Sequence, residues 1–125
     1  LYSGQELPNN KRLQFFEKDV IDWNKNIELH SFYQSLFELK KSHPALAANA
    51  SVEILPATGS LFVFKRKERK REVLCLLNFS NSEKNFQLEQ ASIQTGSFNL
   101  LDRDVKTSED GSILLPPWSF ALIAN

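Results

Sequence analysis

The sequence lacks methionine altogether, contains one cysteine and four glycines in 125 residues, and has no net charge because its 15 acidic and 15 basic side chains cancel. Balanced charge gives no overall attraction to nucleic acid or to an anionic membrane surface. The single cysteine excludes a disulfide within the chain, and its place in an apolar run indicates that Cys75 is a core residue rather than a nucleophile. The cellular compartment is left open. Because even the first residue is not methionine, we expect the chain to be a piece of a longer protein.

Long apolar runs are also missing. None approaches the ~20 residues that span a bilayer, and there is no basic-then-apolar leader, so we expect no membrane partner. The length is enough for one core, or for a small domain with an appendage, that buries roughly two-thirds of the surface of the unfolded chain.

The most apolar stretch is Val73-Leu74-Cys75-Leu76-Leu77-Asn78-Phe79. A strand with one solvent-exposed face alternates apolar and polar residues, whereas an unbroken apolar run of this length is typical of a strand buried on both faces. The sequence therefore predicts a central strand with one layer packed against each side.

A helix and a long loop are predicted before this strand. Leu29, Phe32, Tyr33, Leu36, Phe37 and Leu39 recur at spacings typical of an amphipathic helix, which we place from residue 26 or 27 to residue 42, just before His43-Pro44. Residues 9–26 have poor periodicity but contain five bulky apolar side chains. This composition favours one long ordered loop over disorder.

After residue 51 the pattern changes to short apolar runs separated by turn signals such as Thr58-Gly59 and Asp110-Gly111. This spacing predicts a mainly β fold, an antiparallel Greek-key-like β-sandwich. In the last run, Trp118 and Phe120 share one face and Ser119 and Ala121 the other, so we expect this strand to be half exposed or lightly packed on its second face. The predicted strands are residues 52–55, 61–66, 72–79, 84–88, 97–101, 112–115 and 118–124.

Five motifs in this order resemble the C-terminal part of α-amylase-family glycoside hydrolases. They are similar, in turn, to the Tyr-x-Gly-x-Glu end of the eighth barrel strand, the Asp-Trp of the following loop, the last barrel helix with its His-Pro-Ala-Leu end, a Val-x-Val-x-x-Asn-Phe-Ser strand and the closing strand. The residues that carry the resemblance are Tyr2-Ser3-Gly4-Gln5-Glu6, Asp22-Trp23, Phe32-Tyr33 with Leu36, Leu39-Lys40 and His43-Pro44-Ala45-Leu46, Val73 to Ser80, and Leu115 to Leu122.

The resemblance implies that residues 1–48 are the last strand end, loop and helix of a (β/α)8 barrel and that residues 52–125 form the C-terminal β-sandwich domain. Retaining glycosidases need two carboxyl groups about 5–5.5 Å apart. In the family these acids lie on earlier barrel strands, so they would precede Leu1 and this chain would contain no catalytic residue. We therefore expect a scaffold that stabilises the missing catalytic barrel, with no hydrolysis by this chain alone.

Three residues are candidates for substrate binding. Glu6 lies nearest to the rim of the active site that the resemblance implies, although a structural role at a strand end is the simpler interpretation. Trp23 and Trp118 could stack on a sugar ring, because the flat face of an indole fits the CH face of glucose. For both indoles we favour burial over sugar stacking: burial against the barrel for Trp23, and burial in the core for Trp118 because of the alternation of its strand.

The densest charge run is Lys65-Arg66-Lys67-Glu68-Arg69-Lys70-Arg71. It joins two apolar runs and contains no aromatic residue for base stacking, so we predict a solvated hairpin and no nucleic-acid partner. His30 and His43 have no further ligands at metal-binding spacing, and no phosphate-binding or nucleophile motif is present. We expect no metal and no cofactor.

Two other functions remain open. A weak starch or malto-oligosaccharide-binding module would need at least two aromatic side chains exposed on one face of the sandwich, for which Phe62, Phe64, Phe98 and Trp118 are available. An enzyme remains an option if the chain is one part of a complete hydrolase. The scaffold interpretation predicts an apolar surface on residues 1–46 that drives self-association.

Overall fold

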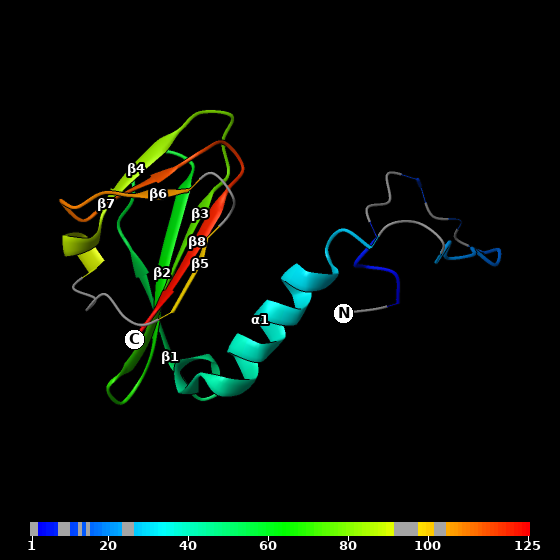
Figure 1. Ribbon diagram of the computed structural model, residues 1–125, viewed down its shortest axis with the longest axis horizontal. Helices are drawn as coiled ribbons and strands as arrows, with labels where there is room; N and C mark the ends of the chain where they lie inside the picture. Colours follow the sequence, from blue (N-terminus) through cyan, green and yellow to red (C-terminus); the bar gives the residue numbers. More distant parts are fainter. Residues whose placement is uncertain are drawn as a thin grey trace. The chain divides into compact units, whose positions relative to one another are not determined.

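The computed structural model describes residues 3–7, 11, 12, 14, 16–23, 27–91, 98–101 and 105–125, with the backbone alone for residues 98–101. The chain divides into two compact units, Leu1–Lys40 and Lys41–Asn125. Figure 1 labels the helix and the strands. Among the described residues, no helix has both the length and the hydropathy that a membrane span requires.

The predicted helix is α1, His30–Ser42. It begins three or four residues later than predicted, because Ile27, Glu28 and Leu29 form a turn in which the His30 N–H donates to the carbonyl of Ile27. It ends where the sequence indicated. His43 has an extended backbone (φ −98°, ψ 118°), as expected for a residue that precedes proline, and the short 3-10 helix η1 follows at Pro44–Leu46.

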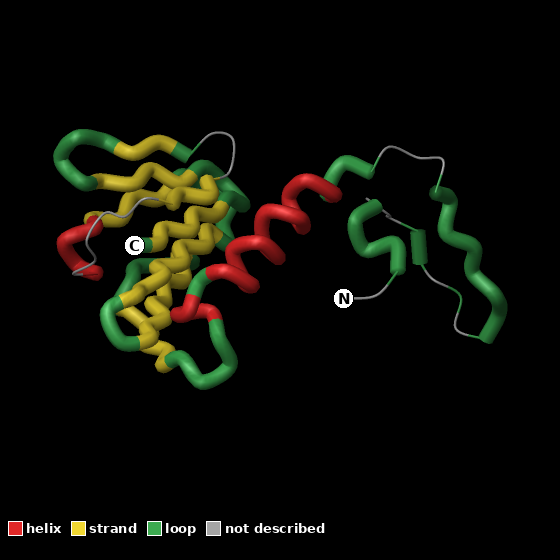
Figure 2. The backbone as a smooth tube through the Cα atoms, turned by 60° about the horizontal axis from the view of Figure 1, so that its bottom comes forward, coloured by secondary structure: helices red, strands yellow, loops and turns green. Residues whose placement is uncertain are grey.

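The second unit is an antiparallel β-sandwich, which confirms the predicted fold class. Its five-stranded sheet has the order β1 (Ser51–Leu55), β2 (Leu61–Glu68), β3 (Arg71–Asn78), β8 (Phe120–Ala124) and β5 (Phe98–Leu101); its three-stranded sheet has the order β4 (Lys84–Gln87), β7 (Ser112–Leu115) and β6 (Lys106–Thr107). Strand β8 lies between β3 and β5, and β7 lies next to β4, so several neighbours in the sheets are not neighbours in the chain. A second 3-10 helix, η2, spans Leu88–Ala91. Figure 2 shows the strands and both short helices in a second view.

Strand β6 is absent from the predicted set of strands. Its two residues, Lys106 and Thr107, are polar and exposed, so they leave no hydrophobic pattern. The strand exists because Lys106 pairs with Leu114 and Thr107 with Ile113 of β7.

The core lies between the two sheets, as in other face-to-face sandwiches. Strands β2, β3 and β8 contribute alternate side chains from one sheet, and β4 and β7 contribute the facing ones from the other. The core cluster contains Leu55, Leu61, Val63, Leu74, Leu76, Phe86, Ala91, Val105, Ile113, Leu115, Ala121 and Ile123.

Strand β3 is buried on both faces, as its composition predicted. Leu74 and Leu76 point into the core and are fully buried, while Val73 and Cys75 on the opposite face are 0% and 4% exposed. The connector after α1 packs against β2 and β3 through η1. It is held there by Arg66, whose guanidinium donates to the carbonyl of Ala47 at 2.7 Å. Burial of such large apolar side chains contributes ~1.5–3 kcal/mol each.

Two predictions about the last strand were wrong. Trp118 was expected in a strand and in the core, but it lies in a turn before β8, and its side chain is 68% exposed. Along β8 the small-residue face is the inner one: Ala121 and Ile123 are buried, whereas Phe120 is half-buried. The reason is the pairing with β3, in which Ala121 lies opposite Leu76; leucines of β3 fill the core beside β8, and a small residue fits next to them.

The basic run forms the predicted hairpin between β2 and β3. Glu68 pairs with Arg71 across it, and Arg69 takes a left-handed backbone (φ 56°) at its tip. Not every base is solvated, because the half-buried Lys65 donates to the carbonyl of Ala91 at 3.1 Å.

A buried amide ties together the loops at the end of β3. Asn78 is 2% exposed, and its Nδ2 lies within 2.8 Å of the carbonyl of Ser82, 3.1 Å of Leu115 and 2.7 Å of Pro116. Its Oδ1 accepts from the Ser80 N–H at 3.1 Å and from the Ser80 hydroxyl at 2.7 Å. We refer to these contacts as the Asn78 network. It joins the loop after β3 to the loop before β8.

Replacement of Asn78 by alanine will leave buried carbonyls and an N–H without partners, so we expect Asn78→Ala to lower the free energy of unfolding by about 3 kcal/mol. Urea unfolding followed by circular dichroism measures the change. The matched control is Asn85→Ala on β4, where the side chain is exposed and the expected change is within about 0.5 kcal/mol. Equal unfolding midpoints for the two variants would contradict a stabilising network.

Burial of Cys75 also has a measurable consequence. Desolvation raises the pKa of its thiol to about 12, against a smaller opposing effect of Arg66. The folded thiol therefore stays protonated at pH 8, and we expect a disulfide reagent to label it only as fast as the chain unfolds. In urea above the unfolding transition, labelling should become rapid. Rapid labelling of the native protein would show that Cys75 is accessible.

Candidate functional site

Glu6 is held by a tight turn in the first unit. The turn is closed by a hydrogen bond of 3.1 Å from the Leu7 N–H to the carbonyl of Gly4. Gly4 has a positive φ of 84°, and a Cβ at this position would lie only 3.1 Å from a side-chain carbon of Ile21. The backbone conformation therefore favours glycine, and any larger residue would also require the Ile21 side chain to shift. The carbonyl of Glu6 accepts from the Leu29 N–H at 3.3 Å, which links the turn to the start of α1.

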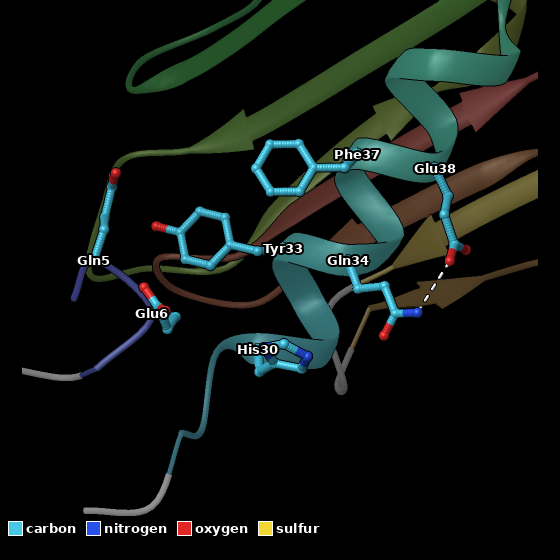
Figure 3. A pocket seen from close by; sticks show the side chains of 7 residues that line it. All are labelled: Gln5, Glu6, His30, Tyr33, Gln34, Phe37 and Glu38. Carbon is cyan, nitrogen blue, oxygen red and sulfur yellow. Dashed lines mark hydrogen bonds between the residues drawn. The ribbon is translucent and has the colours of Figure 1, made fainter. Parts of the chain in front are cut away.

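A hollow of about 360 Å³ lies between this turn and α1 (Figure 3). The rings of Tyr33 and Phe37 lie on one side of the helix with their centroids 6.2 Å apart and nearly parallel. On another side of the helix, the amide of Gln34 donates to the carboxylate of Glu38 at 3.1 Å. The lining residues are Gln5, Glu6, His30, Tyr33, Gln34, Phe37 and Glu38.

The hollow presents an apolar surface with polar groups at its edge. Tyr33 and Phe37 supply two aromatic faces, and the polar groups lie around them. Its volume is at the lower end of the range for small-molecule sites, about 300–1,000 Å³. Among the residues that the structure describes, no group of three or more His, Cys, Asp or Glu side chains could hold a metal ion.

Trp23 is not among the residues that line the hollow with Glu6, so the structure does not bring these two candidates together. Its indole is 51% exposed. It follows the segment of residues 16–22, in which Asp19 accepts hydrogen bonds from the Lys11 ammonium and, at 3.4 Å, from the Gln14 N–H. The bond to Lys11 is the main cause that lowers the pKa of Asp19. Tyr2, the first residue of the motif that ends in Glu6, lies outside the described residues.

The third candidate, Trp118, belongs to the second unit and lies beside an aromatic residue that the sequence analysis did not single out as a site. Phe79 directly follows β3 and is 58% exposed. The Asn78 N–H donates to the carbonyl of Ser119 at 2.9 Å, and the Trp118 N–H donates to the carbonyl of Ser80 at 3.1 Å. The backbones that carry Phe79 and Trp118 therefore run side by side. The pattern at Phe79 concealed its exposure, because it continues the apolar run of β3.

Comparisons with known proteins give a relative in sequence and several in fold. No protein-family profile matches the chain. Alpha-amylase 2 of Dictyoglomus thermophilum is 26% identical over 127 residues, which cover 92% of this chain and 22% of that protein. The chain thus spans less than a quarter of the relative's length.

Solved structures share the fold. Amy13B of Eubacterium rectale superposes with a TM-score of 0.62 at 15% identity, over 94% of this chain and 24% of that one. A trehalose-6-phosphate hydrolase of Bacillus licheniformis gives a TM-score of 0.59 at 19% identity, over 75% of this chain and 18% of that one. Sequence and fold together relate this chain to a part of the α-amylase-family glycoside hydrolases.

Proposed function

We propose that this chain is the C-terminal region of an α-amylase-type glycosidase that acts on α-glucans. In this proposal the β-sandwich stabilises the catalytic barrel, and the chain alone performs no catalysis. The observation that carries the proposal is the sequence match to an α-amylase over 92% of this chain. The sandwich fold of the second unit gives further support.

The domain boundaries follow from the same proposal. Residues 1–48 would be the last strand end, loop and helix of the barrel, and residues 52–125 the C-terminal domain. A barrel of this type closes with eight strands and eight helices. The described part of residues 1–48 contains the single α-helix α1 and no strand, which supports a piece of a barrel rather than a complete one.

Exposed apolar side chains on both units support the inference that the chain packs against the rest of a longer protein. In the first unit Phe16, Val20 and Phe37 are exposed, and in the second unit Val52 and Ile54 stand on the outer face of β1. Ile54 pairs with Phe64 of β2, so apolar side chains of two strands meet on this face. We call Val52, Ile54, Phe62 and Phe64 the aliphatic patch, after its most exposed members. Apolar surfaces of this kind are typical of protein interfaces, and here the natural occupant is the rest of the longer protein.

The absence of catalysis by this chain is directly testable. Purified chain incubated with maltoheptaose at high protein concentration is expected to release no reducing sugar above the buffer blank, because hydrolysis requires two rigidly held carboxyl groups about 5–5.5 Å apart. Wild-type α-amylase serves as the positive control. Release of sugar that follows the protein through two purification steps would refute this part of the proposal.

Self-association through residues 1–46 is the second test. We expect the chain to form concentration-dependent oligomers in analytical ultracentrifugation, and the double variant Phe16→Ser with Val20→Ser to weaken the association about tenfold or more, because two exposed apolar side chains lose their contacts. The matched control is Lys18→Ser, which changes an exposed charged residue between them. A chain that stays monomeric at all concentrations would contradict an interface on residues 1–46.

A further inference from the structure

The turn of the hairpin between β6 and β7 contains the dipeptide Asp110-Gly111. Asp110 is exposed, and Gly111 has a positive φ of 79°. Beyond the chain neighbours of Gly111, no heavy atom lies within 4 Å of the position that a Cβ would take there. Because glycine has no side chain, its backbone nitrogen can approach the carboxyl group of a preceding aspartate more easily than that of any other residue. The turn therefore combines a reactive dipeptide with open space.

The reaction open to this dipeptide is isomerisation of the backbone. The Gly111 nitrogen attacks Cγ of the protonated Asp110 carboxyl group; the nitrogen gives up its proton and the carboxyl group its hydroxyl, which leave together as water. The product is a five-membered succinimide ring. Water then adds to one of the two ring carbonyls and breaks its bond to nitrogen. One opening restores aspartate, and the other leaves the chain linked through Cγ, as isoaspartate, with one more carbon atom in the backbone and no change in mass.

Both reacting groups are held by hydrogen bonds in the folded hairpin. The Gly111 N–H donates to the carbonyl of Ser108 at 3.0 Å, and a carboxylate oxygen of Asp110 accepts from the Ser112 N–H at 3.0 Å. The bond from the Ser112 backbone, and after it the bond with the Ser112 side chain, lowers the pKa of Asp110. A lower pKa leaves less of the protonated carboxyl group that can lose water. The native turn therefore opposes the reaction in two ways.

Isoaspartate at this turn would disturb a strand of the core. The turn is closed by a hydrogen bond of 2.9 Å from the Ser108 N–H to the Ser112 carbonyl, and the Gly111 carbonyl accepts from the Leu88 N–H at 3.0 Å. Turn geometry and loop length set the register of a hairpin. Ile113, the second residue of β7, is fully buried in the core cluster. An extra backbone carbon in the turn is therefore expected to displace a strand that the core needs.

We propose that Asp110-Gly111 is a site of spontaneous isomerisation that the folded hairpin suppresses and that unfolding releases. Each period in the unfolded state converts a further part of the protein into the isoaspartyl form, which folds into a less stable sandwich. The site thus makes repeated or prolonged unfolding progressively irreversible. This chemistry concerns the second unit alone and does not depend on the function of the longer protein.

The test compares the complete 125-residue chain in its native state and in guanidinium chloride above its unfolding transition, at the same pH and temperature. Peptide mapping by chromatography and mass spectrometry separates the isoaspartyl peptide from the aspartyl peptide of equal mass. Isoaspartate at position 110 should form about tenfold or more faster in the unfolded chain, because the native hairpin reacts only while it is open. After refolding, the modified fraction should unfold at a lower urea concentration than fresh protein.

The matched control is Asp110→Glu, which keeps the charge but would have to close a less favourable six-membered ring. After the same incubation this variant should refold with the urea midpoint of its own fresh sample. Asp19 is a control within the chain, because the β-branched Val20 hinders attack by its nitrogen, and Asp19 should stay unmodified. Equal rates in the native and unfolded states would overturn the protection by the hairpin. Absence of isoaspartate at 110 in the unfolded chain, or an equal loss of midpoint in Asp110→Glu, would overturn the site.

Discussion

Burial of β3 on both faces is the constraint on which the rest of the second unit depends. Its central residues are apolar without interruption, so each face must be covered. The three-stranded sheet covers the inner face through Ile113, Leu115 and their neighbours, and the connector that begins at η1 packs on β2 and β3. A strand that alternated apolar and polar residues would need only one of these layers.

Polar side chains close both ends of this apolar strand. At its beginning, the Glu72 N–H donates to the side chain of Asn125 at 2.8 Å, and His43 Nε2 contacts the Asn125 carbonyl at 3.0 Å. At its end, Asn78 satisfies carbonyls from two other loops. A buried network of this kind is useful only when its members are satisfied, which is why it orders the loops around it. Phe79 and Trp118 stand on the loops that the Asn78 network joins.

The surface of the second unit offers two different kinds of apolar group. The aliphatic patch on β1 and β2 combines the side chains of Val52 and Ile54 with the rings of Phe62 and Phe64, and it suits contact with another part of a protein. Phe79 and Trp118 are exposed at one end of the β3–β8 ladder, on loops that the Asn78 network joins. The proposed scaffold function uses the first surface.

The sequence by itself determined the elements: the apolar run of β3, the spacing of α1, the hairpin at the basic run and the motifs shared with the α-amylase family. These depend on local periodicity and local turn residues, which a linear pattern contains. Only the tertiary structure decided which face of β8 is inside and that Trp118 lies in solvent. Alternation tells which residues share a face, but the inner face is selected by neighbouring strands, and the leucines of β3 leave room beside β8 for Ala121 rather than for an indole. The exposure of Phe79 was likewise undetectable, because the strand ends at Asn78 through hydrogen bonds to distant loops.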